Sequence, residues 1–339
     1  MFLDANALPK FSIRPETSNI AKPTWGVLAR YWYPVCRVDE FDGKPIKARL
    51  LDVELVIYPS GEGYTVALDI CPHRHIRLSG GHLEDGNIVC PYHALTFDGS
   101  GACTKIPAGG PGIKVPSSYR LHTFESRQKF GMIWTCLAPD DDKTFPEFPE
   151  LVEAKNEAFL FCKTLLWPCS AARQVENFVD LAHLPVVHES TIGGDPSNRV
   201  TPGRVTESPE GIILTAPYTE FPFGGESRDV SYTFRVVLPF LVDMSLVYKS
   251  GLSMKLYNFA SPTSAYECRV FAFWLDNGHA DEYREFIDGL DEINREDMEI
   301  LSGSALLDLP LNHKFEIHLP SDNVSHAYRR RLVGLGIGS

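Results

Sequence analysis

Two pairs of metal-binding side chains lie close together in the first third of the chain. Cys71-Pro72-His73 is followed, after sixteen intervening residues, by Cys90-Pro91-Tyr92-His93. Two thiolates and two imidazoles can bind tetrahedral zinc, or they can hold a [2Fe–2S] cluster in which two histidines replace two cysteines on one iron. The proline beside each cysteine favours a tight loop over the helix of a zinc finger. The pattern therefore favours the cluster, with zinc as the alternative.

The other cysteines lack this spacing. Eight cysteines in 339 residues do not indicate a disulfide scaffold. We expect the rest to be buried, unreactive thiols: Cys36, Cys103, Cys136, Cys162, Cys169 and Cys268. His75 and His82 lie within the cluster loops but off the ligand pattern, so we expect them at the surface or beside the ligands.

A second group of candidate ligands follows in the sequence Glu-Asn-Phe-Val-Asp-Leu-Ala-His-Leu-Pro-Val-Val-His, which ends at His188. Asn177, Asp180 and His183 recur every three residues, which predicts one side of a helix over residues 173–183. His188 does not follow that period. Pro185 disturbs the turn, however, so the chain could swing His188 back toward His183. One histidine on an apolar face is usually structural, but two beside an aspartate indicate a site.

A histidine pair needs a third ligand, and a later helix, predicted over residues 281–301, offers one. Its buried stripe is marked by apolar residues at steps of three, four and seven: Phe286, Leu290, Ile293, Ile300 and Leu301. Asp297 falls on this stripe, where an unpaired carboxylate is costly unless it meets a cation or a metal. Glu296 and Glu299 are predicted to point into solvent. His183, His188 and Asp297 form a 2-His-1-carboxylate set, which leaves iron coordination positions open for O₂.

The first constellation resembles the Rieske domain signature of the Rieske non-haem iron oxygenases. The similar residues are Cys71-Pro72-His73-Arg74, Cys90-Pro91-Tyr92-His93 and Phe97-Asp98-Gly99. There is one departure, because Ala94-Leu95 stands where the family usually has Gly followed by Trp. The resemblance implies that Cys71 and Cys90 hold the inner iron of a [2Fe–2S] cluster. It also implies that His73 and His93 hold the outer, redox-active iron.

The second constellation resembles the mononuclear iron motif of the same family. Glu-Asn-Phe-x-Asp-x-x-His-x-x-x-x-His is the similar pattern, and Glu296-Asp297 resembles the later acidic pair that supplies the third ligand. The resemblance covers most of the chain, from about Trp32 to Leu301. It implies that Asp180 links the mononuclear iron to the cluster of the adjacent subunit, in a homotrimer. It also implies that Asn177 lies near the iron without binding it tightly.

The elements around these motifs predict an α+β fold in two domains. Short strands broken by turn residues extend over residues 31–136 and include a hairpin formed by Val53–Tyr58 and Tyr64–Leu68. A stretch rich in proline and aspartate, residues 139–149, indicates a linker. Beyond it, runs of strand-forming residues separated by turns predict an antiparallel sheet: Gly211–Thr215, Val230–Leu238, Met244–Lys249, Met254–Phe259 and Glu267–Leu275.

The predicted organisation therefore has a small all-β part and a larger mixed part. We expect a Rieske [2Fe–2S] domain at residues 25–140 and a mononuclear-iron catalytic domain at residues 150–310, an antiparallel sheet with helices of the helix-grip type. Residues 1–24 and 311–339 are predicted to be arms packed on the domains or on a neighbouring subunit.

The composition of the chain argues against nucleic acid and membrane as partners. The 44% hydrophobic and 22% charged residues are typical of a globular protein, and a net charge of −12 argues against nucleic acid. The basic triplet Arg329-Arg330-Arg331 is expected to be a solvated face. No stretch approaches the roughly 18 apolar residues that a membrane span needs. The N-terminus lacks a signal-peptide core, so we expect a cytoplasmic protein.

The resemblance implies the terminal oxygenase of a multicomponent system. The sequence has no nucleotide-binding fingerprint, so a separate NAD(P)H-dependent reductase and/or ferredoxin is expected to reduce the cluster one electron at a time. The length of the chain and its segment Tyr31–Val35 are similar to those of the homotrimeric monooxygenases and demethylases. The favoured reaction is O₂-dependent monooxygenation of a small aromatic or heterocyclic compound, by hydroxylation or by oxidative O- or N-demethylation. The alternatives are cis-dihydroxylation of an arene and, more remotely, a Rieske electron carrier or a zinc-stabilised binding module.

The substrate is not indicated by the sequence. Arg199, Arg235 or Lys249 could hold an acidic group, although each is equally plausible as a surface charge. Aromatic strand residues could line an apolar pocket, although plain core is their commoner role: Phe221, Phe223, Phe240, Tyr248, Tyr257, Phe271 and Phe273.

Overall fold

A computed structural model describes residues 13–338, apart from positions 62, 111, 141–143, 156–157, 196, 198, 210, 277, 279–280 and 282–283. The chain divides into two compact units, and each is described by itself. The first holds the described residues up to 31 together with 35–128 and 133–140, and the second holds 32–34, 129–132 and the described residues from 144 onward. Residues 1–12 of the predicted N-terminal arm lie outside the described residues.

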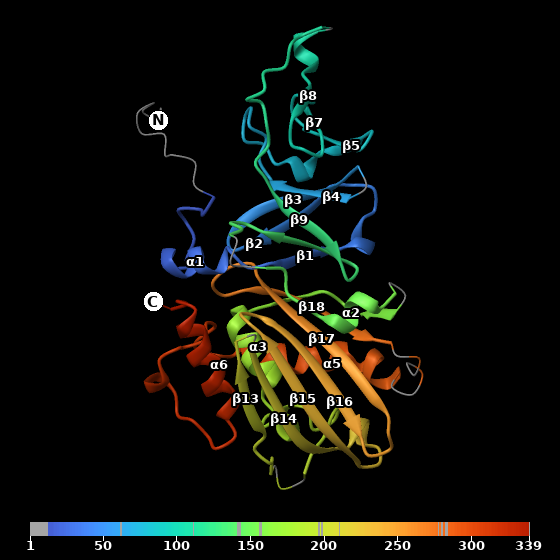
Figure 1. Cartoon of the computed structure of the whole chain (residues 1–339), viewed down its shortest axis with the longest axis vertical. Coiled ribbons are helices and arrows are strands. Elements are labelled where there is room, and N and C mark those ends of the chain that lie inside the picture. Colours follow the sequence, from blue (N-terminus) through green and yellow to red (C-terminus); the bar gives the residue numbers. More distant parts are fainter. Residues whose placement is uncertain are drawn as a thin grey trace. The chain divides into compact units, whose positions relative to one another are not determined.

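The first unit contains two sheets (Figure 1). The larger has the strand order β1-β10-β9-β4-β3-β2, with β1 (Tyr33–Arg37), β2 (Ile46–Leu50), β3 (Val53–Ser60), β4 (Gly63–Leu68), β9 (Thr123–Lys129) and β10 (Met132–Cys136). The smaller has the order β5-β6-β7-β8, with β5 (His82–Glu84), β6 (Asn87–Val89), β7 (Thr96–Phe97) and β8 (Cys103–Lys105). The predicted hairpin is confirmed, because β3 and β4 pair antiparallel with Val56 opposite Ala67.

One apolar core joins the two sheets of this unit and reaches the candidate cluster loops. Val56 and Tyr58 of the larger sheet pack with Phe97 of the smaller sheet, and the side chains of Cys71 and Cys90 belong to the same core. The loops that carry the cysteines are therefore anchored by burial. A helix, α1 (Lys22–Leu28), and short 3-10 turns complete the unit: Val38–Glu40, Leu78–Gly80 and Pro107–Gly109.

The second unit is built on an antiparallel sheet of eight strands in the described part of the chain (Figure 1). The order is β11-β18-β17-β16-β15-β14-β13, and β12 also pairs with β18. The bounds are β11 (Phe159–Phe161), β12 (Leu165–Trp167), β13 (Arg204–Ser208), β14 (Gly211–Glu220), β15 (Arg228–Val237), β16 (Leu241–Tyr248), β17 (Ser253–Pro262) and β18 (Cys268–Leu275). Every predicted run is a strand, and the predicted α+β fold class, a small all-β part followed by an antiparallel sheet with helices, is confirmed.

Helices accompany this sheet. They are α2 (Pro149–Glu153), α3 (Ala171–Val179), α4 (Leu184–Val187), α5 (Arg284–Ser302) and α6 (Asn323–Gly334), with 3-10 turns at Pro222–Gly224 and His313–Phe315. Helix α3 packs on β17 and β18, and α6 packs on α3, β13 and β14. Among the described residues, no helix is both long and apolar enough to cross a membrane.

The predicted helix over residues 173–183 ends early, and that expectation was wrong. Helix α3 stops at Val179, because Asp180 has an extended backbone and its Oδ1 accepts a hydrogen bond from the Ala182 N–H at 2.8 Å. An aspartate that bonds the backbone two residues on offers the chain an alternative to the helix. His183 then immediately precedes the short helix α4.

The prediction that Ile300 is buried was also wrong. Ile300 is exposed, whereas Phe286, Leu290 and Leu301 on the same helix are buried. Residues 300 and 301 lie about 100° apart around a helix, so their side chains point in different directions.

The prediction that Arg329 is solvated was wrong, because its side chain is buried. Its Nε and Nη2 donate to the two carboxylate oxygens of Glu176 at 2.6 and 2.8 Å, and Nη1 donates to the Pro310 carbonyl at 3.0 Å. This bidentate pair ties α6 to α3. Arg330, the next residue, is exposed and pairs with Glu207.

Removing the buried guanidinium should destabilise the second unit. Among the described residues, Arg329→Met leaves Arg173, at 3.3 Å, as the one cation beside the buried Glu176 carboxylate, so we expect a loss of about 3 kcal/mol in the free energy of unfolding. The matched change Arg330→Met removes an exposed pair and should cost less than about 1 kcal/mol. Urea unfolding of the full chain measures both, and equal losses would contradict the assignment.

Candidate metal centres and the cavity beside them

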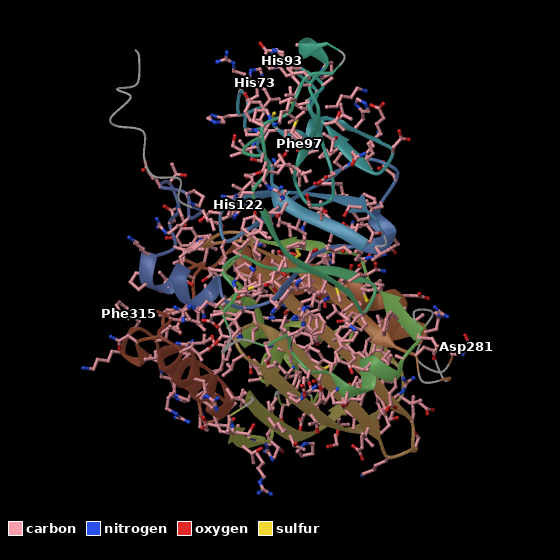
Figure 2. The ribbon with its side chains drawn as sticks, turned by 45° about the horizontal axis from the view of Figure 1, so that its top comes forward. His73, His93, Phe97, His122, Asp281 and Phe315 are labelled. Atoms are coloured by element: carbon pink, nitrogen blue, oxygen red, sulfur yellow. The ribbon has the colours of Figure 1, made fainter. Side chains whose placement is uncertain are left out.

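Two loops hold the first group of candidate ligands. Cys71 and Cys90 begin the loops and are buried, whereas the His73 ring is exposed and the His93 ring is half-buried. The two imidazole centroids lie 4.6 Å apart, and Figure 2 shows both rings at the same end of the first unit. Two thiols from the core thus lie beneath two imidazoles at the surface.

The two loops share one backbone geometry. In the first, His75 N–H donates to the Cys71 carbonyl at 2.9 Å, and in the second, Ala94 N–H donates to the Cys90 carbonyl at 3.0 Å. Both His75 (φ 58°) and Ala94 (φ 55°) adopt the left-handed conformation that favours glycine. This explains why the family usually has Gly at the position of Ala94. Alanine adopts this conformation at a cost of about 1 kcal/mol, so the loop keeps its shape.

The donor chemistry of these loops fits an iron–sulfur cluster. Burial and the neighbouring Cys90 thiol raise the pKa of Cys71 to about 11, so a bound metal is needed to hold the Cys71 sulfur as a thiolate. Among the described residues, the group of three or more ligand atoms lying within 4.8 Å of one another is the second constellation and not this one. Two cysteines and two histidines at the ends of two loops are the donor set of a Rieske [2Fe–2S] cluster.

The second group converges on one oxygen atom. The Nε2 atoms of His183 and His188 lie 3.3 and 3.2 Å from Asp297 Oδ1, and the three ligand atoms lie within 4.8 Å of one another. His188 is 1% exposed and Asp297 is 8% exposed. The Nδ1 atoms face outward, with His183 Nδ1 3.3 Å from Asp180 Oδ2 and His188 Nδ1 2.7 Å from Glu296 Oε2. These contacts turn both Nε2 atoms toward the same point.

The electrostatics of this group fit a metal cation. Asp297 Oδ1 is buried and has no hydrogen-bond partner among the described residues, although two ring nitrogens face it. Burial opposes the charged form of His183, but hydrogen bonds and charges from Asp180 and Asp297 outweigh it and raise the pKa of His183 to about 9. Burial likewise opposes the charged carboxylate of Asp297, yet His183 and His188 hold its pKa well below the usual range. The site thus favours positive charge beside the carboxylate, and a metal ion supplies it.

Glu296 belongs to this centre, and the prediction that it points into solvent was wrong. Besides its contact with His188, its Oε2 accepts a hydrogen bond from Thr191 Oγ1 at 2.7 Å. A carboxylate on the outer nitrogen of a metal-binding histidine fixes the ring and strengthens its donor atom. The one sequence signal for this role was the pairing of Glu296 with Asp297.

A small, mostly apolar cavity of about 70 Å³ adjoins the ligands. Asn177, Asp180, His183, His188 and Asp297 all line it. Its apolar wall comes from the sheet and the helices and includes Phe178, Phe234, Met244, Leu246, Leu256, Trp274, Phe286, Leu290 and Ile293. None of the aromatic residues proposed from the sequence is among the described residues that line it. Glu220 and Tyr232, which the sequence did not single out, complete the lining.

Asp180 and Asn177 also line a second cavity, of about 190 Å³, which is more polar. Its wall includes Arg173, Glu176, Glu316, His318 and Arg329. The Asp180 carboxylate therefore lies between the apolar cavity at the metal ligands and a polar space on the other side.

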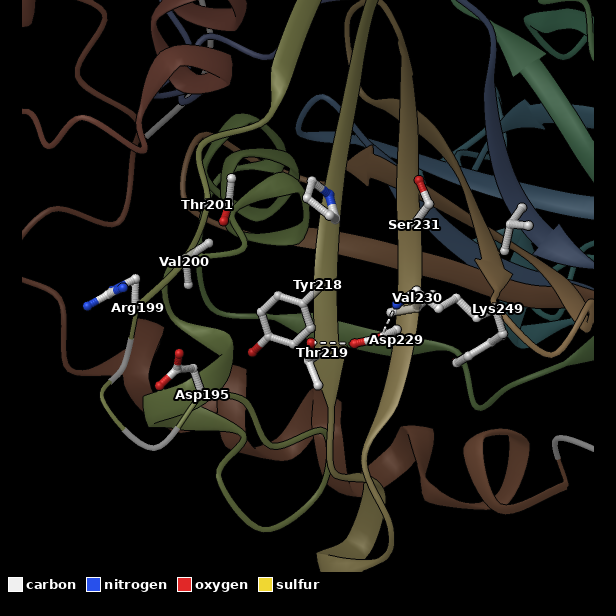
Figure 3. A pocket seen from close by; sticks show the side chains of 13 residues that line it. Asp195, Arg199, Val200, Thr201, Tyr218, Thr219, Asp229, Val230, Ser231 and Lys249 are labelled. Atoms are coloured by element: carbon white, nitrogen blue, oxygen red, sulfur yellow. Dashed lines mark hydrogen bonds and ion pairs between the residues drawn. The ribbon is translucent and has the colours of Figure 1, made fainter.

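A groove of about 550 Å³ in the second unit is shown in Figure 3, and its described lining includes none of the three candidate metal ligands. Arg199 and Lys249 line it, and Lys249 Nζ pairs with Asp229 at 2.6 Å. Arg235 pairs with Asp243, also at 2.6 Å. Among the described residues that line the metal-site cavity, none of the cations considered for an acidic substrate is present.

Comparison with known families covers both units. Residues 31–125 match the Rieske [2Fe-2S] domain, and residues 167–336 match the vanillate O-demethylase oxygenase C-terminal domain. The second match alone spans half of the chain. Together the matches include every candidate ligand found in the sequence.

Relatives and solved structures agree with these matches. The chain is 26% identical to the methylxanthine N1-demethylase NdmA of Pseudomonas putida over 325 residues, 90% of this chain and 88% of the relative. It is 32% identical over 173 residues, half of each chain, to the oxygenase component of dicamba O-demethylase of Stenotrophomonas maltophilia. The structure of Pseudomonas putida NdmA with caffeine has the same fold, with a TM-score of 0.78 and 24% identity over 92% of both chains.

These similarities confirm the predicted family, enzyme class and cofactor types. Relatives are named as N-demethylases, an O-demethylase and dioxygenases of aromatic or heterocyclic compounds. With a Rieske domain followed by this C-terminal domain, the chain belongs to the Rieske non-haem iron oxygenases.

Proposed function

We propose that this chain is the terminal oxygenase of a multicomponent system that monooxygenates a small aromatic or heterocyclic compound. The reaction is hydroxylation, or the oxidative O- or N-demethylation that begins with hydroxylation of a methyl group. The observation that carries the proposal is the convergence of His183, His188 and Asp297 at the edge of an apolar cavity. That arrangement sets a metal ion beside the space in which an apolar substrate can lie.

In this proposal Cys71, Cys90, His73 and His93 hold the [2Fe–2S] cluster. His183, His188 and Asp297 hold the mononuclear iron. When bound, the cluster supplies single electrons and the mononuclear iron activates O₂.

The protein's own contribution is orientation and exclusion of water. Asp180 and Glu296 hold the two imidazole rings, so that both Nε2 atoms stay directed at one point. Leu246, Leu256 and Trp274 form an apolar wall that keeps solvent from the reacting substrate. Asn177 lies near the ligands with its Nδ2 buried and without a hydrogen-bond partner among the described residues. It can therefore donate a hydrogen bond to a substrate or a water molecule in the cavity.

Electrons come, in this proposal, from a separate NAD(P)H-dependent reductase and/or ferredoxin, and the oxygenase works as a homotrimer in the cytoplasm, where NAD(P)H is available. Several relatives are named as the oxygenase component or oxygenase subunit of a larger enzyme, which supports a separate electron donor.

Demethylation is favoured over cis-dihydroxylation by the extent of similarity. The two methylxanthine demethylases align over 90% and 89% of this chain. The oxygenase subunit of phthalate 4,5-dioxygenase from Pseudomonas putida aligns over 50%. Dihydroxylation of an arene remains the second candidate.

A product screen tests the proposed reaction. The purified protein, a surrogate reductase, NADH and O₂ are incubated with methoxy-aryl acids, N-methyl heterocycles and simple arenes. We expect formaldehyde in equal amount with a demethylated product from at least one methylated compound. A dihydrodiol would favour the second candidate. Cluster reoxidation without product from any compound would contradict oxygenase activity on this class.

Metal content tests the two sets of ligands separately. The purified chain should contain about three irons, two in the cluster and one mononuclear. Asp297→Ala, His183→Ala and His188→Ala should each lose the mononuclear iron and turnover, while the absorption of the cluster survives. Cys71→Ser or His93→Ala should instead bleach the cluster. Stoichiometric zinc without iron would contradict the assignment of both sites.

The neighbour of Asp297 on the same helix supplies a matched control. Glu296→Gln keeps the ligand set but weakens the hold on His188, so iron affinity should fall about 10- to 100-fold without being abolished. If Asp297→Ala keeps its iron and Glu296→Gln loses it, Glu296 is the third ligand and Asp297 is not.

Asp180→Asn tests both the electron path and the assembly. We propose that the Asp180 carboxylate, 3.3 Å from His183 Nδ1 and partly exposed, also accepts a hydrogen bond from His93 in a neighbouring subunit. The neutral amide of the variant could not accept from both imidazoles, so turnover should fall by about 100-fold while the trimer, the cluster and most mononuclear iron persist. The measurement is reoxidation of the chemically reduced cluster after addition of substrate and O₂. Reoxidation and product formation at wild-type rates would exclude Asp180 from the path.

A further inference from the structure

The part of the first unit that carries the candidate cluster ligands has the opposite charge balance to the whole chain. Residues 70–124 hold five Lys or Arg and three Asp or Glu, whereas the whole chain holds 32 and 44. From residue 99 to residue 124 the sequence contains neither Asp nor Glu. The rest of the chain therefore repels an acidic protein, and this part attracts it.

A long exposed loop lies within this part. It begins at Lys105, the last residue of β8, and we call residues 105–120 the basic loop. Its described side chains are exposed, apart from two that are partly buried. In Figure 1 it extends away from the larger sheet of the unit. The loop is tightly folded, because a Cβ at Gly109 would lie 2.2 Å from the Ile113 side chain.

The basic loop is attached directly to the candidate cluster site. Lys105 lies opposite Thr96 in the pairing of β8 with β7, and Thr96 comes three residues after His93. The two partly buried residues of the loop, Ile106 and Val115, pack against the apolar core to which both candidate cysteine ligands belong. A protein bound to this loop therefore lies beside the cluster. A one-electron donor has to lie there, because the rate of electron transfer falls steeply with distance.

The cations of the basic loop are available to a partner. Lys114 is exposed, and its ammonium pairs with no carboxylate among the described residues. Arg120 is also exposed, and its Nη2 donates to the Ser100 carbonyl at 2.7 Å, which leaves the charge of the guanidinium uncompensated. Lys105 contacts the exposed Glu84 at 3.5 Å. An exposed pair of this kind contributes little, so Lys105 can exchange its partner.

Apolar side chains lie among these cations. Ile113 and Tyr119 of the basic loop are each 45% exposed, and Tyr92 of the second cluster loop is 61% exposed. Interfaces between proteins are enriched in aromatic side chains and arginine, with polar groups around an apolar centre. The mixture of cations and apolar side chains therefore fits another protein better than it fits a small anion.

We propose that the basic loop docks an acidic one-electron carrier protein, an iron–sulfur or flavin protein, beside the cluster. The inference rests on the proposed function in one respect, that the electrons come from a separate protein. Lys105, Lys114 and Arg120 attract the carrier and orient it, and Ile113 and Tyr119 form the apolar contact.

Two other roles of the basic loop make different predictions. If the loop is only a solvated surface, reversing its charges leaves the binding of a carrier unchanged. If the loop instead binds a second copy of this chain, reversing its charges weakens the self-association of the chain. Carrier binding and the mass of the assembly are therefore measured on the same variants.

The test measures the binding of two oxidised carriers with acidic surfaces, a plant-type [2Fe–2S] ferredoxin and a flavodoxin, to the iron-loaded full chain by biolayer interferometry. We expect at least one of them to bind. Its affinity should fall about tenfold or more when the salt concentration rises from low to molar values, because salt screens exposed charges.

Charge reversal in the basic loop should weaken this binding. The double variant Lys114→Glu with Arg120→Glu should lose about tenfold or more in affinity at low salt, and little at high salt. Arg120→Lys keeps the charge and should bind like the wild type. Lys44→Glu is the matched control, because Lys44 is an exposed lysine of the same unit that precedes β2 and lies outside the basic loop. Its substitution should leave the affinity unchanged.

Stopped-flow reduction of the cluster supplies a second readout. One electron leaves the reduced ferredoxin and enters the [2Fe–2S] cluster of this chain, since a plant-type ferredoxin has the lower reduction potential. At low salt the rate should fall about tenfold or more in the double variant. Complete bleaching by dithionite then shows that the cluster of the variant is intact.

The inference is overturned if neither carrier binds the wild type, if salt does not weaken the binding, if Lys44→Glu weakens it as much as the double variant does, or if the double variant loses its self-association. The product screen separates this result from the proposed function. Docking and cluster reduction that depend on the basic loop, without any oxygenated product, contradict the proposed function and leave the inference standing. An oxygenated product, with carrier binding that does not depend on the loop, does the reverse.

Discussion

The buried carboxylate of Asp297 is the constraint around which the second unit is organised. Two imidazole nitrogens face its Oδ1 at 3.2 and 3.3 Å, and this oxygen has no hydrogen-bond partner among the described residues. A charge in such a position is tolerated only when opposite charge is held against it. The chain must therefore bend between α3 and α4, so that His183 and His188 both reach α5. The bend between α3 and α4 brings both imidazole rings to Asp297 on α5.

The outer contacts of the histidines couple local folding to the chemistry of the site. Asp180 ends α3 by accepting from the Ala182 N–H, and its other oxygen contacts His183. One side chain thus both stops the helix and sets the ring that follows. Asparagine can make the same backbone contact through its carbonyl oxygen, whereas alanine cannot. A substitution to asparagine therefore isolates the chemical role from the folding role, which a substitution to alanine would confuse.

Much of the site could be predicted from the sequence, because its ligands are dense local motifs of residue types with specific chemistry. The strands could be predicted too, since runs of β-branched and aromatic residues between turns are a local signal. The predictions that failed concern features set by competing hydrogen bonds or by contacts between residues far apart in the sequence. The period of three in Asn177, Asp180 and His183 looks helical, yet a side chain to backbone bond at Asp180 wins. The burial of Arg329 depends on Glu176, 153 residues away. The place of Glu220 in the cavity depends on how the sheet packs, which no local pattern encodes.

Three acidic residues line the cavity beside the metal ligands. Asp180 and Asp297 oppose the positive charge of the metal centre, and Glu220 brings a further carboxylate from the sheet side. Lys249 and Arg235 are paired with carboxylates that do not line this cavity. When a metal ion is bound, the two acids near it are compensated, while Tyr232 and Tyr248 donate to the buried Glu220 carboxylate. The same physical requirement, that no buried charge stay unopposed, thus favours a metal ion at His183, His188 and Asp297 and hydrogen-bond donors at Glu220.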